Sequence, residues 1–197
     1  MRESDLKELI KNKVPEKRYI HTLSVAETAV EIAENILNNK QDFFLKKVKY
    51  AALLHDYAKG MEIGILRNMA SLVKDEWNID DEEWLIPQVL HAPISAHLSK
   101  YELGIDDPDV LEAIRYHTVG SPEMGIVAQV IFVADFIEPG RDFATADIVR
   151  ATLNEKKCLE NVIIDICNFI IRYNINHGRQ IHPNTLLLRN AYLRRQA

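Results

Sequence analysis

Apolar residues recur at steps of three and four positions along most of this 197-residue chain. Val25, Ala29, Ile32 and Ile36, for example, fall on one face of an α-helix, and the same spacing returns in most later segments. The run Val127–Val133 also suits a strand, but an isolated strand would lack partners for its backbone. Seven Gly and seven Pro are too few for a sandwich or barrel cut by many turns. The pattern therefore predicts an all-α helical bundle.

Capping residues, Pro and Gly set the expected helix ends. Helices are expected to begin at or near Ser4, Pro15, Asp42, Glu62, Asp80, Pro87 and Asp107, and later ones to cover 124–137, 146–153, 156–176 and 185–194. Gly60 should end the helix that begins at Asp42, just after His55 and Asp56. No repeat or linker divides the chain, so we expect one domain over residues 1–197.

The composition excludes several classes of protein. A hydrophobic fraction of 47% is incompatible with disorder, and a net charge of −5 gives no general attraction to nucleic acid or anionic lipid. A polyanionic ligand would need a local cluster of positive groups. Cys158 and Cys167 are interpreted as free thiols of a reducing compartment. No signal peptide opens the chain, and the most apolar run, Val162–Ile171, is too short for a membrane helix. We expect a soluble, cytoplasmic protein that binds neither nucleic acid nor membranes.

Imidazole and carboxylate groups interrupt the apolar helix faces, and together they indicate a metal. The groups are His21, His55, Asp56, His91, His117 and Asp135. Taken singly, a core histidine is usually only hydrogen-bonded, and Asp135 would usually pair with an arginine. The whole set is hard to satisfy without a cation, and this mixture of ligands suits iron, manganese, zinc or nickel. His97 is out of helical phase with His91, so it is expected to be a surface group or to lie behind the ligands. His177 is expected to cap a helix, and His182 is expected to lie in a loop.

The order of these residues resembles the HD-domain metal-dependent phosphohydrolases, whose pattern is H…HD…D with two intervening histidines. Longer runs resemble the YqeK family, the bacterial symmetrical diadenosine tetraphosphate hydrolases. Those runs are Arg18-x-x-His21-Thr22, Leu54–Lys59, Ala113–Thr118, Ala134–Arg141 and Ile181-His182-Pro183-x-Thr185. The likeness extends from about residue 15 to about residue 190, and the A-D-F-I-E-P-G-R run is far more specific than the bare HD pair.

The resemblance implies a helical bundle with a metal-binding core over about 15–140 and C-terminal helices over 146–194 that complete a nucleotide pocket. It implies iron, mononuclear or dinuclear, with manganese or another divalent transition metal as an alternative. The implied ligands are His21, His55, Asp56 and Asp135, with His91 and His117 available to a second metal. The implied substrate contacts are Arg18, Asp56, Tyr57, Ala58, Lys59, His91, His117, Thr118, Asp135, Arg141, Gly178, Arg179, Gln180, Ile181, His182 and Pro183.

The predicted reaction is attack of metal-bound hydroxide on an inner phosphorus of diadenosine tetraphosphate, which gives two ADP. The expected catalytic residues are His55, Asp56, Lys59, His91 and His117. Arg18, Lys59 and Arg141 would neutralise phosphoryl charge, although without the motifs they would be interpreted as solvated surface charges. Two alternatives stay open: a related hydrolase of a nucleoside triphosphate or guanosine alarmone, and a non-catalytic nucleotide sensor. A homodimer is also compatible with the sequence.

Overall fold

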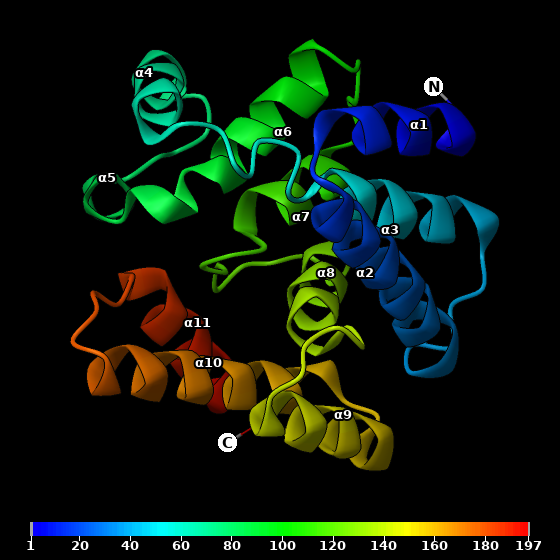
Figure 1. Cartoon of the computed structure of the whole chain (residues 1–197). Helices are drawn as coiled ribbons and strands as arrows, with labels where there is room; N and C mark the ends of the chain where they lie inside the picture. Colours follow the sequence, from blue (N-terminus) through cyan, green and yellow to red (C-terminus); the bar gives the residue numbers. More distant parts are fainter. Residues whose placement is uncertain (1, 197) are drawn as a thin grey trace.

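The computed structural model describes residues 2–196, and every regular element within that range is helical (Figure 1). The elements are α1 (Glu3–Lys13), α2 (Glu16–Asn35), α3 (Asp42–Leu54), α4 (Ile63–Val73), α5 (Asp81–Leu85), the 3₁₀ helix η1 (Pro87–Val89), α6 (His91–Tyr101), α7 (Pro108–Tyr116), α8 (Ile126–Ile137), α9 (Ala144–Lys156), α10 (Leu159–Asn176) and α11 (Pro183–Arg195). The all-α prediction is therefore confirmed.

Helix α8 lies in the middle of the bundle, where helices from both ends of the chain pack against it (Figure 1). The neighbours α2, α3 and α7 belong to the first part of the chain, and α9 and α10 to the last part. Val130, Ile131 and Val133 are fully buried, which accounts for a helix that is apolar on nearly all sides. The run Val127–Val133 lies inside α8, so the helix expected there is confirmed and the alternative of a strand is excluded.

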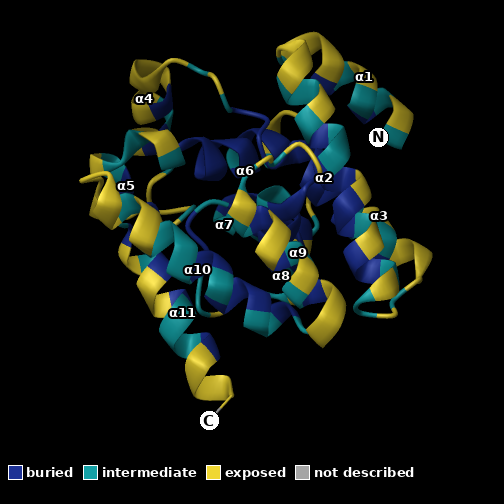
Figure 2. Cartoon of the chain, turned by 60° about the horizontal axis from the view of Figure 1, so that its bottom comes forward, coloured by how far each residue is buried: buried dark blue, intermediate teal, exposed yellow. Residues whose placement is uncertain are grey.

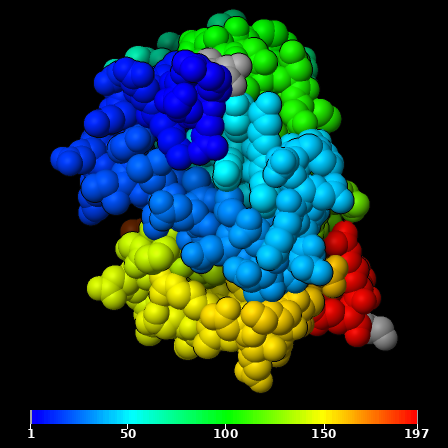
Figure 3. Space-filling view, turned by 90° about the vertical axis from the view of Figure 1, so that its right-hand side faces the viewer, coloured from blue at the N-terminus to red at the C-terminus, as the bar shows by residue number. Residues whose placement is uncertain are grey.

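The other helices surround this centre. The helices α1, α2 and α3 gather on one face of the molecule, with α9 below them (Figure 3). Buried residues collect in the middle of the bundle, and exposed residues cover the outer faces of α1, α4 and α11 (Figure 2). No helix within residues 2–196 is long and apolar enough to span a bilayer. Both cysteines are free thiols, as expected.

Several predicted boundaries differ from the structure, among them three in the first half of the chain. Helix α3 ends at Leu54, so His55 lies in the turns before Gly60 rather than inside the helix. The helix expected from Pro87 is interrupted: a 3₁₀ turn comes first, and α6 begins at His91. The N-cap of α1 is Arg2, not Ser4, so Ser4 lies inside the helix. At this end the Asp5 carboxylate accepts a hydrogen bond from the Arg2 backbone N–H at 3.4 Å. The first two differences place His55 and His91 at helix ends.

Candidate metal centre

Four of the predicted ligands converge from three parts of the chain. His21 comes from the start of α2, His55 and Asp56 follow α3, and Asp135 lies near the end of α8. His21 Nε2 lies 3.1 Å from Asp135 Oδ1. His55 Nε2 lies 3.7 Å from Asp56 Oδ2 and 4.0 Å from Asp135 Oδ1. The donor atoms of His21, His55 and Asp56 all lie within 4.8 Å of one another, close enough to share one cation.

A second group of donors uses the other oxygen of the same aspartate. Asp56 Oδ1 lies 3.0 Å from His91 Nε2 and 3.5 Å from His117 Nε2. The two Nε2 atoms are themselves 3.1 Å apart. The three side chains form another set with donor atoms within 4.8 Å of one another. Asp56 therefore faces both groups, with one oxygen toward each.

The backbone orients three of the four histidines. His55 Nδ1 lies 2.6 Å from the Ala52 carbonyl, His91 Nδ1 2.7 Å from the Gln88 carbonyl, and His117 Nδ1 2.8 Å from the Ile114 carbonyl. In each case the carbonyl belongs to the residue three positions earlier. A carbonyl only accepts, so each Nδ1 carries the proton and each Nε2 keeps a free lone pair directed at the centre.

The fourth histidine is oriented by a carboxylate. His21 Nδ1 lies 3.1 Å from Glu138 Oε1, and Glu138 is buried at the end of α8. The same carboxylate accepts a hydrogen bond from the Gly140 N–H at 2.6 Å. Carboxylate–histidine pairs of this kind fix the imidazole behind a metal ligand. Sequence reasoning missed Glu138 as a site residue, although it lies within the A-D-F-I-E-P-G-R run.

The charges in the centre suit cation binding at neutral pH. Burial lowers the pKa of His55 to about 4 and that of His91 to about 4, so both imidazoles are neutral. Burial would raise the pKa of Asp135, but the hydrogen bond to His21 and the Arg141 charge outweigh it and lower the pKa. Burial would lower the pKa of His21, yet its bonds to Asp135 and Glu138 raise it overall. Ionised carboxylates thus face the neutral imidazoles of His55 and His91.

Two buried polar atoms of the centre lack hydrogen-bond partners in the described part of the chain, which indicates a site for a cation. Within residues 2–196, His55 Nε2 and Asp56 Oδ1 are buried and have no hydrogen-bond partner. The nearest groups to Asp56 Oδ1 include Nε2 of His91 and of His117, whose protons are on Nδ1, so lone pairs face lone pairs. A divalent metal ion satisfies such a set, and the mixture of imidazole and carboxylate suits a transition metal.

Three cationic side chains lie beside the carboxylates of the centre. Arg18 Nη1 lies 2.6 Å from Asp56 Oδ2, and Arg141 Nη2 lies 2.6 Å from Asp135 Oδ1. Lys59 Nζ lies 3.8 Å from Asp56 Oδ1 and 3.1 Å from His91 Nε2. Above these groups opens a pocket of about 960 Å³, to which His21 and all three cations contribute.

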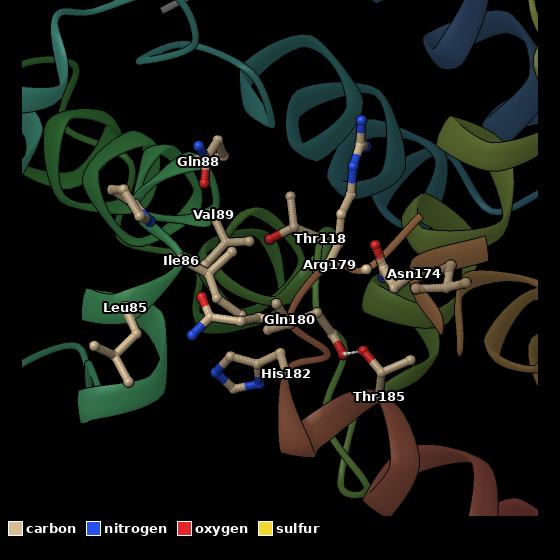
Figure 4. Close-up of a pocket in the computed structure, with 14 residues that line it drawn as sticks. Leu85, Ile86, Gln88, Val89, Thr118, Asn174, Arg179, Gln180, His182 and Thr185 are labelled. Atoms are coloured by element: carbon tan, nitrogen blue, oxygen red, sulfur yellow. Dashed lines mark hydrogen bonds between the residues drawn. The ribbon is translucent and has the colours of Figure 1, made fainter. Parts of the chain in front are cut away.

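A second pocket, of about 730 Å³, lies where the loop between α10 and α11 meets η1 (Figure 4). Its lining includes five of the predicted substrate contacts: Thr118 and the loop residues Gly178, Arg179, Gln180 and His182. Six other predicted contacts line neither this pocket nor the one above the metal centre: Tyr57, Ala58, His91, His117, Ile181 and Pro183. Tyr57 and Ala58 are buried, and the Ala58 N–H donates to the Ser95 hydroxyl at 2.9 Å, so both belong to the packed interior next to Asp56 in the sequence.

His182 takes part in a structural network beside this pocket. Its Nδ1 accepts from the Asn184 N–H at 3.2 Å, and its Nε2 lies 3.1 Å from Asp80 Oδ1. Asp80 also caps α5 by accepting from the Glu83 N–H at 2.8 Å, and Glu83 pairs with the buried Arg115 through two contacts of 2.7 Å. Asp80, Glu83 and His182 lie close enough to hold a metal, but these partners already occupy them.

The two remaining histidines lie outside the centre, as expected. His97 Nδ1 accepts from Trp77 Nε1 at 3.3 Å, and His177 follows the last residue of α10.

A helical bundle with paired histidines and aspartates at its centre defines a class of metal-dependent hydrolases, and the comparisons agree. The HD domain family model matches residues 18–140, so the chain belongs to the HD domain family. Relatives named "Bis(5'-nucleosyl)-tetraphosphatase, symmetrical" cover nearly its whole length. The protein of Halalkalibacterium halodurans is 35% identical over 96% of each chain, and that of Bacillus subtilis is 36% identical over 92% of each.

A solved structure extends the same likeness to the fold. A predicted HD superfamily hydrolase involved in NAD metabolism, from Clostridium acetobutylicum, has a TM-score of 0.89 and 32% identity. The match covers 99% of this chain and 98% of the other. The resemblance to the family of symmetrical tetraphosphatases, inferred from the short motifs, is thereby confirmed.

Proposed function

We propose that this protein is a metal-dependent hydrolase that cleaves diadenosine tetraphosphate into two molecules of ADP. The observation that carries the proposal is the pair of donor groups that share Asp56, with three cations beside them and a large pocket above. The names of the relatives support this substrate and this symmetrical cleavage.

The metal is proposed to be held by His21, His55, Asp56 and Asp135. A divalent transition metal there supplies an activated water and neutralises phosphoryl charge, and we propose iron, with manganese as the alternative. Asp56 Oδ1, His91 and His117 offer a second position, which supports a dinuclear centre.

The cations are proposed to change partners when metal and substrate bind. Arg18 and Arg141 each contact a carboxylate at 2.6 Å, and a metal would compete for those same oxygens. The released guanidinium groups can then bind phosphoryl oxygens, for which their planar fork is suited. Lys59, beside His91, is placed to neutralise charge on the departing ADP.

The pocket of Figure 4 is proposed to hold one adenosine. Leu85, Ile86 and Val89 offer apolar surface, and the amides of Gln88 and Gln180 offer hydrogen bonds. This combination is typical of nucleoside pockets, in which apolar walls bind the base and a few polar groups orient it.

Product analysis tests the proposal directly. Protein purified without oxygen and loaded with iron should convert diadenosine tetraphosphate into ADP alone, and metal analysis should find one or two metal ions per chain. Formation of AMP and ATP, or of free triphosphate, would refute the symmetrical reaction and favour the related hydrolase. Tight binding without any ADP over hours would favour the nucleotide sensor, against which the complete donor set and Lys59 argue.

We further propose a cytoplasmic location, which the two free thiols support. A homodimer stays a prediction that light scattering can test.

A further inference from the structure

A substrate with two identical halves would meet two unlike pockets in this protein. A cavity of about 230 Å³ shares Thr118 with the pocket of Figure 4, and shares Asp135 and Arg141 with the pocket above the metal centre. The three cavities adjoin one another through these shared residues and are together called the groove; His117 lines its middle cavity. The inference below rests on the proposed function and concerns the second half of the substrate.

The two ends of the groove differ in the number of cationic side chains that line them. At the pocket of Figure 4, Arg179 is the one Lys or Arg among the lining residues, which suits a nucleoside. The pocket above the centre is lined by four cations, Lys17, Arg18, Lys59 and Arg141, and by the carboxylates of the metal centre, Asp56, Asp135 and Glu138, which a bound metal would neutralise. A tetraphosphate chain carries several negative charges, so it would extend from the centre toward this end.

The cation-lined pocket also has apolar surface at its rim. Ile20 lines it with 59% of its surface exposed, although it directly precedes His21 in α2. Pro15 and Pro139 are exposed and line the same pocket. Ile20 is not part of the apolar core, to which α2 contributes instead Val25 and Ala29.

After Ile20, Lys17 is the second residue that distinguishes the rim of this pocket. It is exposed at the rim, and within residues 2–196 it has no carboxylate partner, whereas Arg18 and Arg141 both do. A free ammonium group beside an exposed apolar side chain suits a ligand with a phosphate next to a base and a sugar.

We propose that the rim formed by Pro15, Lys17, Ile20 and Pro139 is a second nucleoside diphosphate subsite. The first adenosine occupies the pocket of Figure 4, the inner phosphates lie over the metal centre, and the other adenosine packs on Ile20 while Lys17 contacts its phosphates. The two ADP products then leave from unlike subsites.

Substitutions of Ile20 in opposite directions test the subsite. Ile20→Ala removes apolar contact and should raise the KM for diadenosine tetraphosphate about fivefold, equivalent to about 1 kcal/mol. Ile20→Trp adds a ring on which a base can stack and should lower that KM about fivefold. The inhibition constant of ADP, which the first pocket determines, should not change in either variant. Ile148 in α9 is a matched control, because it is also exposed, at 61%, and lines none of the three cavities.

Lys17→Ala provides an independent test of the phosphate contact. It should raise the same KM about fivefold at low salt and lose this effect at high salt, since the contact is screened. Lys11→Ala, which removes an exposed lysine of α1, should have no effect.

The outcomes separate the two proposals. Wild-type metal-loaded protein that forms no ADP would refute the proposed function. Active wild-type protein whose Ile20 variants behave like the Ile148 variants would refute the subsite alone. Equal changes in KM and in the inhibition constant of ADP would also refute it, because Ile20 would then act on the first half of the substrate.

Discussion

The role of Glu138 in orienting His21 can be tested quantitatively. Its carboxylate lies 3.1 Å from His21 Nδ1 and holds the ring so that Nε2 faces Asp135. Substituting such an orienting carboxylate typically costs about tenfold to about 100-fold in metal affinity. Glu138→Gln keeps a side chain of the same shape and an oxygen that still accepts from Nδ1, so we expect the lower value. Glu138→Ala removes the bond and leaves a cavity, so we expect the higher value.

The pH dependence distinguishes this role from simple packing. The bonds to Asp135 and Glu138 raise the pKa of His21 overall, so protons compete with the metal as the pH falls through this raised value. Glu138→Gln removes a negative charge and should bring that pKa down. The pH at which metal affinity begins to fall should therefore move lower, even though the affinity at pH 8 is weaker than in the wild type.

The assay is a competition titration with a coloured chelator between about pH 5.5 and about pH 8. Glu123→Gln, a change at an exposed glutamate that lines none of the three cavities, serves as the control. Melting curves of the metal-free variants report any loss of fold. Wild-type affinity and an unchanged pH profile in Glu138→Gln would refute the assignment of Glu138 as the group that orients His21.

Three further predictions concern the centre and its support. Asp56→Ala should abolish both metal retention and ADP formation, because both donor groups lose their shared carboxylate; full metal content in the purified variant would contradict this. Removal of the metal by a chelator should lower the Tm, since a metal at 100 times its Kd contributes about 2.7 kcal/mol to folding; an unchanged Tm would mean that the centre binds no metal in the folded state. Arg115→Met should cost about 3–5 kcal/mol in urea unfolding, because the buried Glu83 loses its ion pair. The added change Glu83→Gln should recover most of that loss.

Local signals made much of the fold predictable. Asp107 followed by Pro108 predicted the start of α7, and Asp107 does accept from two backbone N–H groups there. The apolar run ending at Ile137 predicted α8, and Gly125 sets its start two residues later than expected. Such signals lie within one turn of the residues that they affect, and they are therefore visible in the sequence.

Pairings between distant residues were not predictable in the same way. Glu138 and His21 are 117 positions apart, and Asp80 and His182 are 102 positions apart. Neither pair has a fixed spacing, because the packing of α2 on α8, and of the loop before α11 on α5, brings them together. At the break between η1 and α6, which the sequence reasoning overlooked, His91 Nδ1 lies 2.7 Å from the Gln88 carbonyl, in the turn that joins the two helices.

The carbonyl groups behind His55, His91 and His117 have a consequence for protein engineering. Each of these ligands carries its orienting group in its own turn of backbone, three residues upstream. The side chains of Ala52, Gln88 and Ile114 play no part in that contact, so they can be exchanged without changing the tautomer of the ligand. Each of these three histidines, together with the turn of backbone before it, can therefore be placed at a helix end of another scaffold in protein design. His21 cannot be transferred in this way, because its orientation depends on the buried carboxylate of Glu138 at the end of another helix.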